Sequence, residues 1–169
     1  DKGRNGELWV LDLKSNTPTR LTFTDSSERA PVWSPDSRWI YFKAGYTQGK
    51  KKAPYNGKSQ VWRMRADGTQ LQGMTREASG IKSFRLSQDG NALYYVIATE
   101  KVDDPWKALR KAHKKVEYGH GVTKLSQLWR LDLRAWRKKM LVDDHRVITS
   151  FNVTPDESAV VMQTKPDPT

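Results

Sequence analysis

Three copies of one unit run through the sequence, and this internal repeat restricts the possible fold more than any other feature. Each copy opens with a segment around a tryptophan, at residues 7–13, 60–65 and 127–133. Constant distances then separate each tryptophan from an apolar residue (12 positions), a turn aspartate (27) and a β-rich run (31). Landmarks that keep the same offsets in three copies indicate one structural unit built three times.

Each unit predicts four short strands. The side chains of residues 8–13 alternate between two faces, which fits a strand in a packed sheet. A polar turn follows, and residues 20–23 form the next predicted strand. The Ser-Pro-Asp-Ser sequence at 34–37 suits a tight turn between the last two strands. Four antiparallel strands in about 40 residues are typical of a β-propeller blade. We therefore predict an all-β fold, a β-propeller fragment of about three four-stranded blades.

The predicted partial propeller covers residues 7–163, with repeats at about 7–43, 59–98 and 126–163 and two insertions between them. The first insertion, 44–58, is rich in glycine and lysine and reads as an exposed loop. The second insertion, 101–125, predicts a short basic helix and loop, because Asp104 can cap a helix that has Pro105 at its first position. This second insertion carries seven Lys or Arg against three acids.

The first repeat carries Leu-Trp-x-Leu-Asp-Leu at 8–13, Arg-Leu-Thr at 20–22 and Trp-Ser-Pro-Asp-Ser at 33–37. With these segments it resembles the repeat of TolB-type proteins. The same repeat builds the N-terminal propeller of the prolyl oligopeptidase family of serine peptidases. The charged insertion followed by Ser-Gln-Leu-Trp at 126–129 is similar to the acylaminoacyl-peptidase branch, which we favour.

Blades of such propellers are counted from the strand before Ser-Pro-Asp. Residues 28–78 and 80–143 then form whole blades, 7–24 the outer half of an earlier blade and 146–163 the inner half of a later one. Propellers close with about four to eight blades. The chain is therefore expected to be a fragment of a larger propeller, or else to pair its open edges with another chain. We favour the fragment, since residues 1–6 resemble neither an initiator region nor a signal peptide.

The resemblance to the peptidase family implies a non-catalytic propeller portion that gates substrate access to an α/β-hydrolase domain absent from these residues. The implied partners are that hydrolase domain and a peptide substrate. Arg110, Lys111 and Lys114 on the basic helix are candidates for contacting the hydrolase domain or a neighbouring subunit. The alternative is a TolB-type propeller that serves as a protein-binding platform. A third hypothesis is a homo-oligomer, in which two three-repeat chains complete one ring.

No catalytic, cofactor-binding or metal-binding residues are predicted. A Gly-x-Ser-x-Gly nucleophile elbow is absent, and His113, His120 and His145 lack metal-ligand spacing. Because Asp36, Asp89 and Asp156 occupy the same position in every repeat, we assign them to structural turns, and Asp12 and Asp132 to strand ends. The repeat tryptophans are predicted to pack between blades; they are Trp9, Trp62 and Trp129.

Composition excludes several further classes. The sequence has no cysteine and no apolar run near the roughly 18 residues that span a bilayer, so disulfide frameworks and a transmembrane helix are not expected. The net charge of +11 permits an anionic partner. Nucleic-acid binding is disfavoured, because the basic residues are not interleaved with aromatic ones. The compartment is not determined, and an exported or periplasmic location is favoured over a cytoplasmic one.

Overall fold

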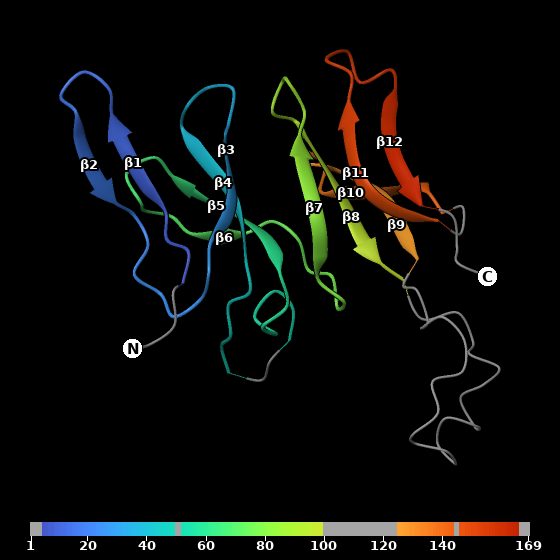
Figure 1. Cartoon of the computed structure of the whole chain (residues 1–169), viewed down its shortest axis with the longest axis horizontal. Helices are drawn as coiled ribbons and strands as arrows, with labels where there is room; N and C mark the ends of the chain where they lie inside the picture. Colours follow the sequence, from blue (N-terminus) through green and yellow to red (C-terminus); the bar gives the residue numbers. More distant parts are fainter. Residues whose placement is uncertain (1–4, 50–51, 100–124, 144–145, 166–169) are drawn as a thin grey trace.

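The chain folds into a row of antiparallel β-sheets, which Figure 1 shows from blue to red along the sequence. The computed structural model describes residues 5–49, 52–99, 125–143 and 146–165. Within these ranges the strands are β1 (Trp9–Asp12), β2 (Thr17–Arg20), β3 (Arg29–Trp33), β4 (Trp39–Ala44), β5 (Gln60–Arg65), β6 (Gln72–Gly73), β7 (Ile81–Leu86), β8 (Ala92–Ala98), β9 (Ser126–Asp132), β10 (Arg137–Val142), β11 (Val147–Val153) and β12 (Val160–Lys165).

Two of the sheets are complete and two are halves. The complete sheets have the strand orders β3-β4-β5-β6 and β7-β8-β9-β10. The two-stranded sheets β1-β2 and β11-β12 lie at opposite ends of the row. The described residues therefore confirm an all-β propeller fragment, and the complete sheets are those expected from counting blades at the Ser-Pro-Asp turn. Apart from Leu125, the predicted basic helix at 101–125 lies outside the described residues.

The second strand of the first repeat lies earlier than the prediction of 20–23. Asp12 Oδ1 accepts hydrogen bonds from the main-chain N–H groups of Lys14 and Ser15, at 2.8 and 3.0 Å. This turn reverses the chain within a few residues, so pairing resumes at once with Asp12 opposite Thr17. The strand is therefore Thr17–Arg20, and the sequence-based prediction was wrong because it gave the aspartate no part in the turn.

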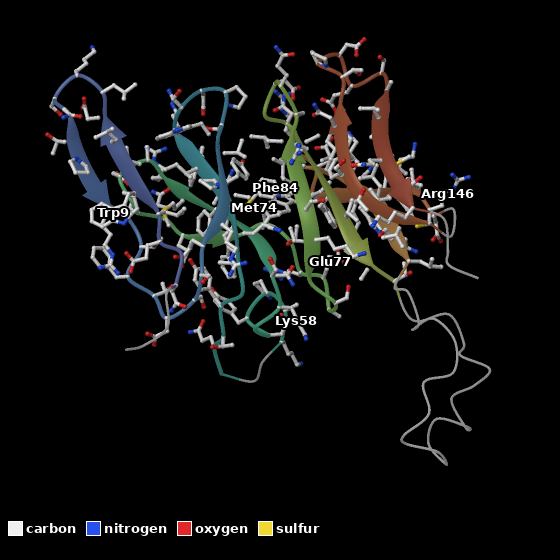
Figure 2. All side chains as sticks on the ribbon, in the orientation of Figure 1. Trp9, Lys58, Met74, Glu77, Phe84 and Arg146 are labelled. Carbon is white, nitrogen blue, oxygen red and sulfur yellow. The ribbon has the colours of Figure 1, made fainter. Side chains whose placement is uncertain are left out.

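Each junction between neighbouring sheets holds one hydrophobic cluster, because successive side chains of a strand point to opposite faces. Figure 2 shows Met74 and Phe84 between the two complete sheets. Tyr41 and Val61 meet Leu93 and Tyr95 in this cluster. The junction with β1-β2 is filled by Leu8 and by residues of the first complete sheet, including Ile40, Phe42, Trp62 and Met64. The junction with β11-β12 is filled by Tyr94, Val96, Leu128, Ile148 and Phe151, among others.

The three repeat tryptophans differ in burial, so the prediction that all of them pack between blades was wrong for one. Trp62 is fully buried, and Trp129 is partly buried against the central cluster. Trp9 is 57% exposed at the outer end of the row, where Figure 2 labels it. Trp62 packs against residues of the sheet before its own, whereas β1-β2 is the first sheet among the described residues.

The repeated aspartates have the structural role that the sequence predicts. Asp36 Oδ1 accepts hydrogen bonds from the Ser34 hydroxyl and from the N–H of Arg38. Asp89 makes the equivalent bonds, with the Ser87 hydroxyl at 2.6 Å and the N–H of Asn91 at 2.9 Å. Each carboxylate thus ties its turn to the start of the following strand.

These turn bonds predict a loss of stability in acid. The ordinary pKa of an aspartate is 3.8. The pKa of Asp89 is lowered to about 2, mainly by the hydrogen bond from the Ser87 hydroxyl. The pKa of Asp156 is also lowered to about 2, mainly by the Thr154 hydroxyl. A carboxyl whose pKa is lower in the folded state stabilises the fold above its unfolded pKa. The free energy of unfolding, measured with urea, should therefore fall as the pH drops from 3.8 towards 2. In Asp89→Asn, the free energy of unfolding should fall less steeply with decreasing pH. A variant whose stability falls as steeply as that of the wild type would contradict the assignment.

Candidate functional site

A groove lies between the outer strands of the two complete sheets. It has a volume of about 720 Å³. One wall comes from the loop and strand at 71–77, and the other from β9, β10 and the turn that joins them. Its lining is aromatic, apolar and charged, and includes Tyr55, Leu71, Gly73, Arg76, Glu77, Tyr95, Trp136 and Lys138.

The floor of the groove depends on close packing against Trp62. Gly73 in β6 lies against this ring and against Pro54, and a Cβ at position 73 would come within 3.2 Å of Trp62 Cζ3 and 3.0 Å of Pro54 Cγ. Tyr55 packs on the same ring, with the ring centroids 5.1 Å apart. A fully buried tryptophan therefore sets the shape of a surface groove from below.

A buried glutamine holds the acidic residue of the groove in place. The Gln60 side chain is fully buried. Its Oε1 accepts hydrogen bonds from the Thr75 hydroxyl (2.8 Å) and the Glu77 N–H (3.0 Å), while its Nε2 donates to the Glu77 carbonyl (2.6 Å). Both main-chain groups of Glu77 are thereby bound to one amide, which fixes the direction of the Glu77 side chain.

The carboxylate of Glu77 is neutralised by groups of the neighbouring sheet. Lys138 Nζ lies 3.1 Å from Glu77 Oε1 and also stacks 4.7 Å from the centroid of the Trp129 ring. The Tyr95 hydroxyl donates to the same oxygen at 2.8 Å. Burial, together with the hydrogen bond to Glu77, raises the pKa of Tyr95, so the phenol remains a donor. The Glu77 side chain is only 14% exposed and its charge is satisfied, so it is part of the wall.

Two side chains of the lining remain available to a ligand. Arg76 is exposed and makes no ion pair within the part of the chain that the structure describes. Trp136 is 51% exposed in the turn between β9 and β10. Its backbone lies in the left-handed region with φ 54°, where an L side chain costs about 1–2 kcal/mol. A bulky residue in this conformation is uncommon, and such strain gathers at functional positions.

The first repeat shows how unusual Trp136 is. Asn16 occupies the equivalent position, seven residues after the repeat tryptophan, with φ 53°. Asparagine is one of the few residues that adopt this conformation readily. The same turn geometry is therefore built without strain in one repeat and with an exposed tryptophan in another. Our interpretation of the sequence missed this residue, and comparing the turn positions of the repeats would have found it.

A second polar cluster is buried between β1-β2 and the first complete sheet. Glu28 is 4% exposed, and the equivalent positions of the other repeats hold Ile81 and Ile148. Its carboxylate accepts hydrogen bonds from the hydroxyls of Thr22 (3.0 Å), Thr24 (2.6 Å) and Tyr46 (2.9 Å). Burial and the bond to Glu28 raise the pKa of Tyr46, which keeps this hydroxyl protonated. Since both carboxylate oxygens of Glu28 are hydrogen-bonded and the residue is only 4% exposed, we assign this cluster a structural role.

The structure does not describe the candidate site residues predicted from the sequence. Arg110, Lys111 and Lys114 lie outside the described residues, as do His113, His120 and His145. The described part of the chain holds no group of three or more His, Cys, Asp or Glu side chains arranged for a metal ion. It also contains no helix long and apolar enough to cross a membrane.

Comparisons with known proteins identify the fold. No protein-family model matches the sequence. An uncharacterised protein of Agrobacterium fabrum is 32% identical over 90 residues, which cover 53% of this chain and 28% of that protein. A solved structure assigned to TolB from Agrobacterium tumefaciens superposes with a TM-score of 0.61 at 21% identity, over 95% of this chain and 50% of that one. TolB from Acinetobacter baumannii gives 0.62 at 12% identity, over 94% and 32%.

The chain thus spans 28% of the length of the curated relative, and half and about a third of the two solved chains. Likeness at these identities establishes architecture, and it does not separate TolB-type proteins from the peptidase branch that the sequence favoured. The strand order, the three inter-sheet clusters and these superpositions lead to one conclusion: the chain has a TolB-type β-propeller fold.

Proposed function

We propose that this propeller section binds an extended polypeptide in the groove between its two complete sheets. The observation that carries the proposal is Trp136, which is half exposed at the groove and is held in a strained left-handed conformation. The few residues that carry most of the binding energy at protein interfaces are enriched in tryptophan, tyrosine and arginine. Trp136, Tyr55 and Arg76 bring these three residue types to one groove.

The charges of the site indicate which polypeptide it would take. Glu77 is already paired with Lys138, whereas Arg76 has no such partner among the described residues. The whole chain carries a net charge of +11, which attracts anionic partners and speeds their association. A segment that combines apolar and acidic side chains therefore fits the groove, its apolar groups on Trp136 and its carboxylates near Arg76.

The test is the binding of a labelled peptide that alternates glutamate with leucine, followed by fluorescence anisotropy. Trp136→Asn should weaken binding about tenfold or more, the usual loss at a central aromatic contact. The same change should leave the protein as stable as before or more stable, since asparagine tolerates the left-handed turn, as Asn16 does. Arg76→Gln should weaken binding of the acidic peptide, and it should leave unchanged the binding of a peptide that alternates glutamine with leucine.

The matched control is Trp9→Asn, because Trp9 is 57% exposed but lies at the end of the row, away from the groove. It should not change peptide binding. Equal losses in Trp136→Asn and Trp9→Asn would show non-specific adhesion to exposed tryptophan. Binding that survives Trp136→Asn would place the site elsewhere.

Two biological settings use such a groove, and we propose both as versions of one function. In the first, the polypeptide is a substrate and the propeller gates a prolyl-oligopeptidase-like hydrolase domain. In the second, the polypeptide is the partner of a TolB-type binding platform at an exported or periplasmic location. A serine-directed fluorophosphonate probe on the natural full-length protein separates them. Labelling supports the peptidase gate, and an unlabelled protein that still binds the peptide supports the platform.

A further inference from the structure

A pocket of about 510 Å³ opens at the end of the two complete sheets where β3 and β7 begin and β4 ends. None of its described lining residues belongs to the groove between the outer strands. Lys58, which Figure 2 labels, directly precedes one of the lining residues and marks this end of the first complete sheet. The lining brings together two cations and three hydroxyl groups, from Arg29, Lys43, Ser26, Ser27 and Ser59.

The two cations of this pocket stand directly opposite each other. Arg29 of β3 pairs with Lys43 of β4, and side chains placed in this way have Cβ atoms about 4.5–5.5 Å apart. Like charges directly opposite each other in a sheet are destabilising. Neither cation forms an ion pair with any residue that the structure describes, including Asp25, a carboxylate of the same lining. Lys43 Nζ instead donates a hydrogen bond to the main-chain carbonyl of Lys82 in β7.

Elsewhere in the fold, a cross-strand pair of the same kind is balanced by acids. Lys139 of β10 stands opposite Arg130 of β9. The Arg130 guanidinium lies 3.2 Å from Glu157 Oε2 and 3.7 Å from Asp132 Oδ2. The pair in the pocket has no such acids within the described ranges, so its two positive charges are available to an anionic ligand.

The other repeats show that the sheet does not need a lysine at the position of Lys43. The equivalent residues are Val96 in the second complete sheet and Gln163 in β12. Val96 is fully buried, in the hydrophobic cluster at the junction with β11-β12. Lys43 is half-buried, and burial lowers its pKa, with a further contribution from the charge of Arg29. A charged amine therefore replaces apolar packing, although burying a charge is costly.

The backbone of β3 is distorted in a way that brings Arg29 opposite Lys43. In the pairs β7-β8 and β11-β12, the residue opposite the position of Lys43 is Ser83 or Ser150. Their equivalent in β3 is Ala30, but a register shift there leaves Arg29 opposite Lys43 instead. Ala30 has φ 54°, in the left-handed region that alanine rarely adopts. Bulges and strained residues gather next to functional sites, where they redirect a side chain.

We propose that this pocket binds a phosphate group, which Arg29 and Lys43 hold through their side-chain N–H groups. The planar guanidinium offers two parallel hydrogen bonds to phosphate oxygens, and the ammonium adds a compact charge. A phosphate monoester carries about −1.5 to −2 charges at neutral pH, so it balances both cations, whereas one carboxylate balances only one of them. The serine hydroxyls of the lining supply further donors. This proposal is independent of the peptide groove.

Titration with inorganic phosphate, followed by NMR of the main-chain amides, tests the site at the level of single residues. Relative to chloride at equal ionic strength, phosphate should shift the signals of Arg29 and Lys43 in a saturable way. Lys43→Val, which introduces the residue of the second complete sheet, should weaken binding about tenfold or more, the usual loss of a charged hydrogen-bond donor. Arg29→Gln should weaken it to a similar extent. Without phosphate, Lys43→Val should unfold at the same urea concentration as the wild type or at a higher one, since it removes a half-buried cation that faces another.

The matched control is Lys139→Val, because Lys139 is an exposed lysine that also stands opposite an arginine. It should leave the phosphate affinity unchanged. Shifts that do not saturate, or a Lys43→Val variant that binds phosphate as tightly as the wild type, would overturn the proposal. Acetate that binds as tightly as phosphate would overturn the choice of phosphate. Inorganic phosphate and glycerol phosphate present the same group, and the one that binds more tightly identifies free phosphate or a phosphate ester as the ligand.

Discussion

Replacing Trp62 with alanine is expected to lower the free energy of unfolding by about 3–5 kcal/mol, the usual cost of removing a buried aromatic side chain. Trp62 is fully buried between β1-β2 and the first complete sheet. Its ring meets Tyr46 edge-on, with centroids 4.8 Å apart, and its Nε1 donates to the Ala44 carbonyl at 3.1 Å. The substitution removes the contact between two sheets and leaves a carbonyl without its donor.

Urea unfolding followed by circular dichroism measures this loss. The control is Phe23→Ala, since Phe23 is an aromatic side chain that is 74% exposed. Its removal should cost less than about 1 kcal/mol, because exposed substitutions away from special features have small effects. A similarly small loss in Trp62→Ala would contradict the inter-sheet packing described above. Trp62→Ala should also weaken peptide binding, since the ring supports Gly73 and Tyr55 at the floor of the groove.

Replacing Glu28 with isoleucine, the residue of the other two repeats, is expected to lower the free energy of unfolding by about 2–4 kcal/mol. The change removes the acceptor of three hydroxyl groups, and a buried donor left without an acceptor costs about 1–3 kcal/mol. Thr22 and Tyr46 are both buried, whereas Thr24 is exposed and can turn to water. Isoleucine recovers part of the loss by burying apolar surface.

A second substitution shows whether the lost hydrogen bonds cause the effect. Tyr46→Phe removes the orphaned hydroxyl, so the double variant should be more stable than the sum of the two single losses predicts. Glu7→Gln is the control, because Glu7 is an exposed glutamate paired with Arg20 on the surface and should cost less than about 1 kcal/mol. If the stability losses of the two single variants simply add up in the double variant, the proposed hydrogen-bonded cluster around Glu28 would be contradicted.

The residues that form the groove could not be identified from the repeat pattern of the sequence. Gln60, Glu77 and Lys138 come from separate strands and loops of two neighbouring sheets, and the offset pattern of the repeat assigns no function to any of them. Trp136 was detectable in principle, because it stands where the first repeat has an asparagine. Its exposure and its strained backbone became known only from the fold. The candidate residues Arg110, Lys111 and Lys114 remain predictions.

The sequence by itself determined the repeat, the four-stranded unit, the blade boundaries and the structural role of the repeated aspartates. These depend on local patterns, namely alternation, turn residues and fixed offsets, which each copy carries within its own residues. Tertiary structure alone decided which repeat tryptophans are buried. Trp9 and Trp62 occupy the same position in their repeats, but Trp9 is 57% exposed at the end of the row and Trp62 is fully buried against a neighbouring sheet. Burial depends on what lies across the junction, and that partner comes from another part of the chain.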